Sequence, residues 1–130
     1  MSLVISISGI RGTIGGRPGE GLTPLDTVRF TSSYGAWLRE QCGKDRPLVV
    51  LGRDARVSGP MVEQLVAATL SSMGIDVLNA GFATTPTVEV AVCKARADGG
   101  IILTASHNPA QWNALKLLNG KGEFLSAKDG

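Results

Sequence analysis

The feature that most restricts the fold of this chain is an alternation of short apolar runs with amphipathic segments. Residues 48–51, 75–80 and 100–103 have the length and character of strands. Between them, apolar residues recur every three or four positions, as on one face of a helix. Strand, helix, strand, helix, strand at this spacing favours right-handed crossovers and a parallel sheet covered on both faces. We therefore predict an α/β fold, a three-layer α/β/α sandwich.

Capping residues indicate where the helices begin and end. Thr23 and Asp26 form a capping-box pattern at the start of the first helix, and Gly43 follows its last turn. Ser58 is expected to cap the second helix, and Thr85 to begin the third.

The last strand is expected at residues 115–119. The loop that connects it to the strand at 100–103 is too short for a parallel return, so this strand should run antiparallel. Residues 3–21 are rich in glycine and are expected to form a strand that breaks into a loop. The prediction is therefore a mostly parallel, mixed four-stranded sheet with its last strand antiparallel.

Composition indicates one domain of ordinary size and excludes several classes of function. The 130 residues are 43% hydrophobic, enough to bury a core. Lysine and arginine are scattered and the net charge is +2, so no basic stripe for nucleic acid is present. Cys42 and Cys93 lack the spacing of a zinc site, which fits a reducing cytoplasm. The apolar run at residues 3–7 is too short for a signal peptide or membrane span.

A polar loop with the sequence T-A-S-H-N-P, residues 104–109, directly follows the strand at 100–103. Open α/β sheets place ligand chemistry at such strand ends. The residues around Ser106 do not form the Gly-x-Ser-x-Gly elbow of hydrolases, and neither nucleotide-binding glycine motif is present. On the residues alone, capping of a short turn by Ser106 or Asn108 is an equally good interpretation.

Four stretches together resemble the α-D-phosphohexomutases, the family of phosphoglucomutase and phosphomannomutase. They are the T-A-S-H-N-P loop, G-I-R-G at residues 9–12, G-R-D-A-R-V-S-G at residues 52–59, and Lys116, ten residues beyond the serine. Family members have four domains. The resemblance therefore implies that residues 1–130 are the N-terminal domain, which carries the phosphoserine loop, with the later domains absent from this chain.

The resemblance also implies catalytic and binding roles. Ser106 would give a phosphoryl group to a hexose phosphate and take one back from a bisphosphate intermediate, exchanging the 1- and 6-positions. Lys116 would be the general acid/base, although a solvated lysine is the alternative and Ala114 replaces a family glycine before it. Arg11 would contact phosphate. His107 would serve in catalysis or substrate and phosphate binding, or shape the loop.

Magnesium and further domains complete what the resemblance implies. Mg²⁺ would be held by the phosphate on Ser106 and by aspartates of a later domain; this chain has no D-x-D-x-D run and should not bind it tightly alone. The expected partners are a hexose phosphate and the remaining domains, without which the chain should be inactive. Two alternatives are a phosphoglucosamine mutase, disfavoured by residues 111–116, and a non-catalytic module that binds sugar phosphate or a partner.

Two further expectations concern structure. Asp54 should pair with Arg53 or Arg56 and brace the loop before the second helix. The domain alone should also self-associate as a dimer, through an apolar sheet edge at its last strand. The expected contributors are Leu115, Leu117, Leu118, Phe124 and Leu125.

Overall fold

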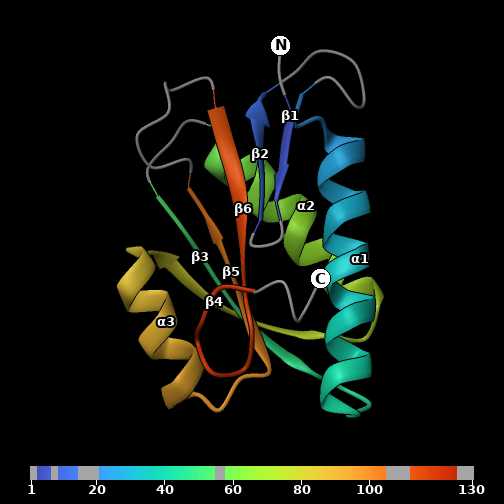
Figure 1. Ribbon diagram of the computed structural model, residues 1–130, viewed down its shortest axis with the longest axis vertical. Helices are drawn as coiled ribbons and strands as arrows, with labels where there is room; N and C mark the ends of the chain where they lie inside the picture. Colours follow the sequence, from blue (N-terminus) through green and yellow to red (C-terminus); the bar gives the residue numbers. More distant parts are fainter. Residues whose placement is uncertain (1–2, 7–8, 15–20, 55–57, 105–111, 126–130) are drawn as a thin grey trace.

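A computed structural model describes residues 3–6, 9–14, 21–54, 58–104 and 112–125 (Figure 1). The described strands form one six-stranded sheet in the order β1-β2-β6-β5-β3-β4. The strands are β1 (Leu3–Ser6), β2 (Gly9–Thr13), β3 (Leu48–Arg53), β4 (Asp76–Phe82), β5 (Gly99–Leu103) and β6 (Trp112–Leu118). The helices are α1 (Pro24–Cys42), α2 (Gly59–Ser72) and α3 (Thr85–Lys94).

The strand directions confirm a mixed sheet, but the predicted number of strands was too small. β3 pairs in parallel with both β4 and β5, and β6 runs antiparallel to β5 as predicted. The two additional strands, β1 and β2, form an antiparallel hairpin, and β2 pairs with β6. The glycines at the N-terminus suggested one strand and a loop, whereas Gly9 and Gly12 lie within β2, paired with β6.

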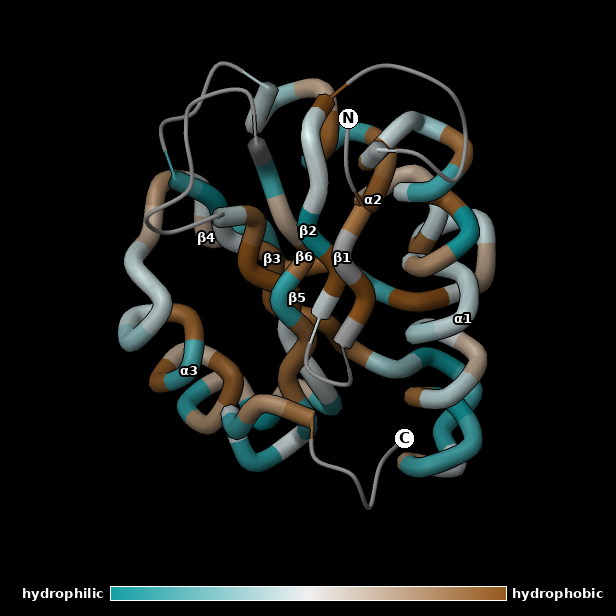
Figure 2. Tube along the Cα trace, turned by 45° about the horizontal axis from the view of Figure 1, so that its top comes forward, coloured by the Kyte–Doolittle hydropathy of each residue, from teal (hydrophilic) through white to brown (hydrophobic). Residues whose placement is uncertain are grey.

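Helices cover both faces of the sheet, which confirms the three layers (Figure 1). Helices α1 and α2 pack on one face over alternate residues of β3, β5 and β6, and α3 packs on the other face. Figure 2 shows the most hydrophobic stretches along the strands between these helices. The first core includes Leu38, Val49, Leu51, Val66, Ile101, Leu103, Leu115 and Leu117, and the second includes Val50, Val88, Val92, Ile102 and Leu118.

The helix ends follow the predicted caps with one exception. Thr23 and Asp26 form the reciprocal capping box at α1, and Gly43 ends that helix with φ of 63°. Ser58 lies at the N-cap of α2, but its side chain makes no capping hydrogen bond there. Its hydroxyl instead accepts a hydrogen bond from another part of the chain, described below.

The predicted dimer surface was assigned to the wrong strand. β6 lies inside the sheet between β2 and β5, so the edges are β1 and β4. Leu115, Leu117 and Leu118 are buried in the chain's own cores because α1, α2 and α3 cover both faces of β6. Self-association itself stays a prediction, but β6 does not offer the unpaired apolar edge that was expected to mediate it.

No helix among the described residues has both the length and the apolar character needed to cross a membrane.

Candidate functional site

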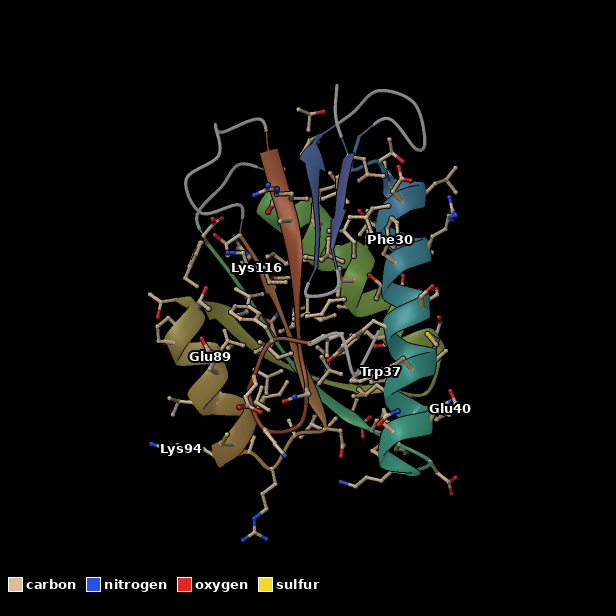
Figure 3. The ribbon with its side chains drawn as sticks, viewed as in Figure 1. Phe30, Trp37, Glu40, Glu89, Lys94 and Lys116 are labelled. Atoms are coloured by element: carbon tan, nitrogen blue, oxygen red, sulfur yellow. The ribbon has the colours of Figure 1, made fainter. Side chains whose placement is uncertain are left out.

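Two of the predicted site residues, Arg11 and Lys116, lie on one face of the sheet. The register places Arg11 of β2 opposite Ala114 of β6, and Gly9 opposite Lys116. Residues directly opposite each other share a face, and alternate residues along a strand share it too. Leu115 and Ile10 face α1 and α2, so Arg11 and Lys116 are on the face of α3. Figure 3 shows Lys116 beside β6 on the side away from α1.

Arg11 and Lys116 are therefore diagonal neighbours, about 7–8 Å apart between backbones by ordinary sheet geometry. Arg11 is exposed and Lys116 is half-buried. Two long cationic side chains on one face can reach the same anionic group. The arrangement therefore suits a phosphate or another anion held over β2 and β6.

The replacement of a family glycine by Ala114 does not disturb the strand that carries Lys116. Ala114 lies within β6, and among the described non-glycine residues only Arg96 has a positive φ. Ala114 therefore needs no positive φ, and extended backbone accommodates its side chain. Gly9, by contrast, needs to lack a side chain: a Cβ there would overlap the carbonyl oxygen of Leu115 and lie 3.1 Å from the Cα of Lys116.

The segment with Ser106 and His107 lies outside the described residues, but both of its ends are placed. The amide of Thr104, just after β5, donates to the carbonyl of Ala114 in β6 at 3.2 Å. The segment therefore leaves and re-enters the sheet at adjacent strands. Its re-entry point, Trp112, is four residues before Lys116.

A hollow of about 620 Å³ opens at the carboxyl ends of β3, β4 and β5. It lies beside Thr104 and the first turn of α3, at the edge where open α/β sheets bind ligands. Its lining mixes hydroxyl groups, charges and one aromatic ring. Among the described residues, the lining consists of Arg53, Asp54, Phe82, Ala83, Thr84, Thr85, Thr87 and Thr104.

Arg53 is fixed by a different partner from the one predicted. Its Nε donates to Glu63 of α2 at 2.7 Å, in an ion pair whose two side chains are 16% and 18% exposed. Its guanidinium also lies 4.3 Å from the centre of the Phe82 ring. The predicted pairing of Arg53 with Asp54 is therefore replaced by a link to α2 and β4, while Arg56 lies outside the described residues.

Sequence reasoning missed Asn113, a buried polar residue near the start of β6. Its side chain is fully buried, and its Nδ2 donates to the hydroxyl of Ser58 at 2.9 Å. Its Oδ1 accepts from the amide of Ala114 at 2.8 Å. An asparagine in a mostly apolar strand was the available signal, because a buried amide needs partners for each of its polar atoms.

Metal ligands are not gathered in the part of the chain that the structure describes. There, no three histidine, cysteine, aspartate or glutamate side chains come together as a cation would require. Octahedral Mg²⁺ accepts few protein ligands, commonly one or two carboxylates with phosphate and water.

The chain is thus a three-layer α/β/α domain, with two basic residues on one sheet face and a partly hydroxyl-lined hollow at the carboxyl ends of its parallel strands. Residues 4–129 match the family described as phosphoglucomutase/phosphomannomutase, alpha/beta/alpha domain I. The chain therefore belongs to the phosphoglucomutase/phosphomannomutase family.

Relatives with two different names match this chain at similar sequence identities. A phosphoglucomutase/phosphomannomutase of Thermococcus kodakarensis is 42% identical over 116 residues, which is 88% of this chain and 25% of that protein. A phosphoglucosamine mutase of Verminephrobacter eiseniae is 38% identical over 118 residues, 91% of this chain and again 25% of the relative. The chain thus spans about a quarter of the length of these curated relatives.

Solved structures agree with the fold. A Thermus thermophilus protein, provisionally named a phosphomannomutase, superposes with a TM-score of 0.85 and 29% identity. The superposition covers 99% of this chain and 28% of that protein. A phosphoglucomutase/phosphomannomutase family protein of Burkholderia thailandensis gives a TM-score of 0.75 at 27% identity, over 95% of this chain and 27% of its own.

Proposed function

We propose that this domain supplies the phosphoserine of a phosphohexomutase, an intramolecular phosphotransferase. Ser106 would donate its phosphoryl group to one hydroxyl of a hexose phosphate and recover the other group from the bisphosphate. The observation that carries the proposal is the placement of Arg11 and Lys116 on one face, next to the strand ends that hold the Ser106 segment. Family membership supports the reaction type.

Arg11 and Lys116 would have different roles in this reaction. The guanidinium of Arg11 can bind two phosphate oxygens at once and so orient the group in transfer. The amine of Lys116 can take the proton from the attacking sugar hydroxyl and return it to the leaving oxygen. His107 would bind substrate or phosphate from within the same segment as Ser106.

Magnesium would touch this chain only through the phosphate on Ser106. The described residues offer no carboxylate cluster for it, so the remaining ligands would come from the later domains of the enzyme. When bound, the ion would neutralise charge on the transferring phosphoryl group. The hexose phosphate and those domains are accordingly the proposed partners.

Phosphorylation of the chain tests the role of Ser106. The complete enzyme, with this domain in place, is incubated with a hexose 1,6-bisphosphate, and peptide mass mapping locates any added phosphoryl group. We expect it on Ser106 and expect none in Ser106→Ala. Ser33→Ala is the control, because Ser33 is an exposed serine on α1 whose hydroxyl donates to the carbonyl of Arg29. If the added phosphate lies on other serines in both Ser106→Ala and Ser33→Ala, the proposal is contradicted.

The substrate has two candidates that relatives support. The sequence of residues 111–116 favours a phosphoglucomutase or phosphomannomutase, whereas relatives of both names match the chain at similar identity, 42% and 38%. The complete enzyme should be assayed with glucose, mannose and glucosamine phosphates. A kcat/KM for glucosamine phosphate at least about tenfold above the others would select the second candidate.

A further inference from the structure

The connection between β3 and α2 contacts both flanks of the segment that contains Ser106. At its first residue, the amide of Asp54 donates to the carbonyl of Leu103, the last residue of β5, at 3.1 Å. At its other end, the hydroxyl of Ser58 accepts from Nδ2 of Asn113 at the start of β6. One connection thus joins the strand before the segment and the strand after it.

The hydrogen bond between Ser58 and Asn113 is unusual for a helix N-cap. A serine at this position ordinarily uses its side chain to cap the amides of the first turn. Ser58 has helical backbone geometry and makes no such bond, so its hydroxyl serves β6 instead of α2. Asn113 has no solvent-exposed surface, so loss of this partner would leave a buried amide donor unsatisfied.

The residue that precedes the connection, Arg53 at the end of β3, is also held in place. Arg53, immediately before Asp54, is bonded to Glu63 of α2, and Glu63 also accepts from Asn79 of β4 at 3.1 Å. Gly59 allows α2 to approach, because a Cβ there would lie 3.3 Å from the guanidinium of Arg53. Arg53, at the end of β3, is therefore tied to α2 and, through Glu63, to β4.

We propose that Ser58 and Asn113 form a positioning brace for phosphoryl transfer, an inference that rests on the proposed function. Neither residue acts on the substrate. Their hydrogen bond fixes the point at which the Ser106 segment re-enters β6, three residues before Lys116. The brace thereby sets the separation between the phosphoryl group on Ser106 and the amine of Lys116.

The expected effect of losing the brace is on the chemical step. A shift of about 1 Å in reacting groups can lower a rate by up to about 100-fold, because transfer depends on orientation. A role confined to stability would instead lower the melting temperature and leave kcat unchanged well below that temperature. Turnover and stability therefore distinguish the two roles.

The test uses four variants of the complete mutase. Ser58→Ala removes the acceptor, and Ser58→Thr keeps the hydroxyl. Asn113→Ala removes the donor, and Ser72→Ala is the matched control, because Ser72 is a serine at the opposite end of α2 whose hydroxyl donates to the carbonyl of Thr69. For each variant, kcat, KM, the melting temperature and the level of Ser106 phosphorylation are measured.

We expect Ser58→Ala to lower kcat about tenfold with KM within about twofold, the pattern of impaired orientation of the reacting groups with substrate binding intact. Ser106 should still become phosphorylated, Ser58→Thr should recover most of the turnover, and Ser72→Ala should match the parent. If Asn113→Ala does not fold, Ser58→Ala still decides the question, because Ser58 is only partly buried.

Two results would refute the brace and the proposed function separately. A parental kcat in Ser58→Ala, in an enzyme that Ser106→Ala inactivates, would refute the brace and leave the proposed function intact. A complete enzyme that neither phosphorylates Ser106 nor interconverts hexose phosphates would refute the proposed function, and the brace with it.

Discussion

The hydroxyl of Tyr34 occupies the space that a side chain at Gly99 would need. Tyr34 projects from α1 to the sheet, where its hydroxyl accepts from the amide of Gly100 at 3.0 Å and donates to the carbonyl of Leu118 at 2.5 Å. A Cβ at Gly99 would overlap that hydroxyl. The tyrosine thus joins β5 to β6 at the end of the sheet opposite the site, and glycine at position 99 makes room for it.

We expect Gly99→Ala to lower the free energy of unfolding by about 2–4 kcal/mol. The added methyl group overpacks the core, which typically costs about 1–3 kcal/mol, and displaces a buried hydrogen-bonding hydroxyl. Urea unfolding monitored by circular dichroism measures the change. The double variant Gly99→Ala/Tyr34→Phe should lose less than the sum of the two single variants, because Tyr34→Phe removes the clash. Strict additivity would show that the two residues do not compete for this space.

From the buried phenol of Tyr34 we also expect a loss of stability at alkaline pH. Burial raises the pKa of its phenol far above the ordinary value of about 10. Since the pKa is higher in the folded chain than in the unfolded chain, the stabilising contribution is complete below about pH 10 and is lost as the pH rises beyond it. We expect the free energy of unfolding to fall above about pH 10 by up to about 1.4 kcal/mol per pH unit.

Tyr34→Phe is the control for this alkaline loss. The hydrogen bond from Lys44 to Asp98 raises the pKa of Lys44, which changes stability in the same direction over this range. Tyr34→Phe keeps that ion pair and removes only the phenol, so its stability should fall less steeply with pH. Equal slopes for the parent and the variant between about pH 9 and 11 would exclude Tyr34 as the source.

The layers of the fold were predictable because they depend on local patterns. Apolar runs and helix caps such as Thr23 and Gly43 act within a few residues, and the structure has them where they were expected. The hairpin of β1 and β2 was missed because its strands are short and its stability depends on pairing with β6, distant in sequence. The position of β6 inside the sheet, which buries Leu115 and Leu118, depends on that same pairing.

Less of the candidate site than of the fold could be predicted from the sequence. Arg11 and Lys116 were identified by resemblance, but their common face follows only from the register of β2 on β6. Arg53 has carboxylates nearby in sequence, so its pairing with Glu63 across ten residues could not be chosen without the packing of α2 on β3. The bond of Ser58 to Asn113 spans 55 residues, and no local pattern indicates it.

Lys116→Met should slow turnover in the complete enzyme by roughly 10²- to 10⁴-fold, the usual scale for loss of a general acid/base. Methionine keeps the length of the side chain on β6, so the fold and the phosphorylation of Ser106 should survive. Steady-state assays and peptide mass mapping measure the two properties separately. A parental turnover rate would exclude proton transfer by Lys116.

The 130-residue chain alone should have no mutase activity. It spans about a quarter of the length of its relatives, and no three potential metal ligands come together among its described residues. A coupled assay of the purified chain, with the complete enzyme as reference, checks this expectation. Turnover that persists after removal of any full-length contaminant would contradict it.

Gly9→Ala should impair both stability and turnover, because Gly9 lies opposite Lys116 and has no room for a methyl group. Overlap with the carbonyl of Leu115 would push β2 away from β6, at a cost of about 1–3 kcal/mol, and move Lys116 relative to Arg11. Ala114→Gly is the matched control: it removes a methyl group from the same face, in extended backbone, and should cost about 1 kcal/mol or less without reducing kcat. Melting temperatures and kcat of both variants are compared with those of the parent. If Gly9→Ala retains the parental kcat, the close approach of β2 does not position Lys116, even if the variant is less stable.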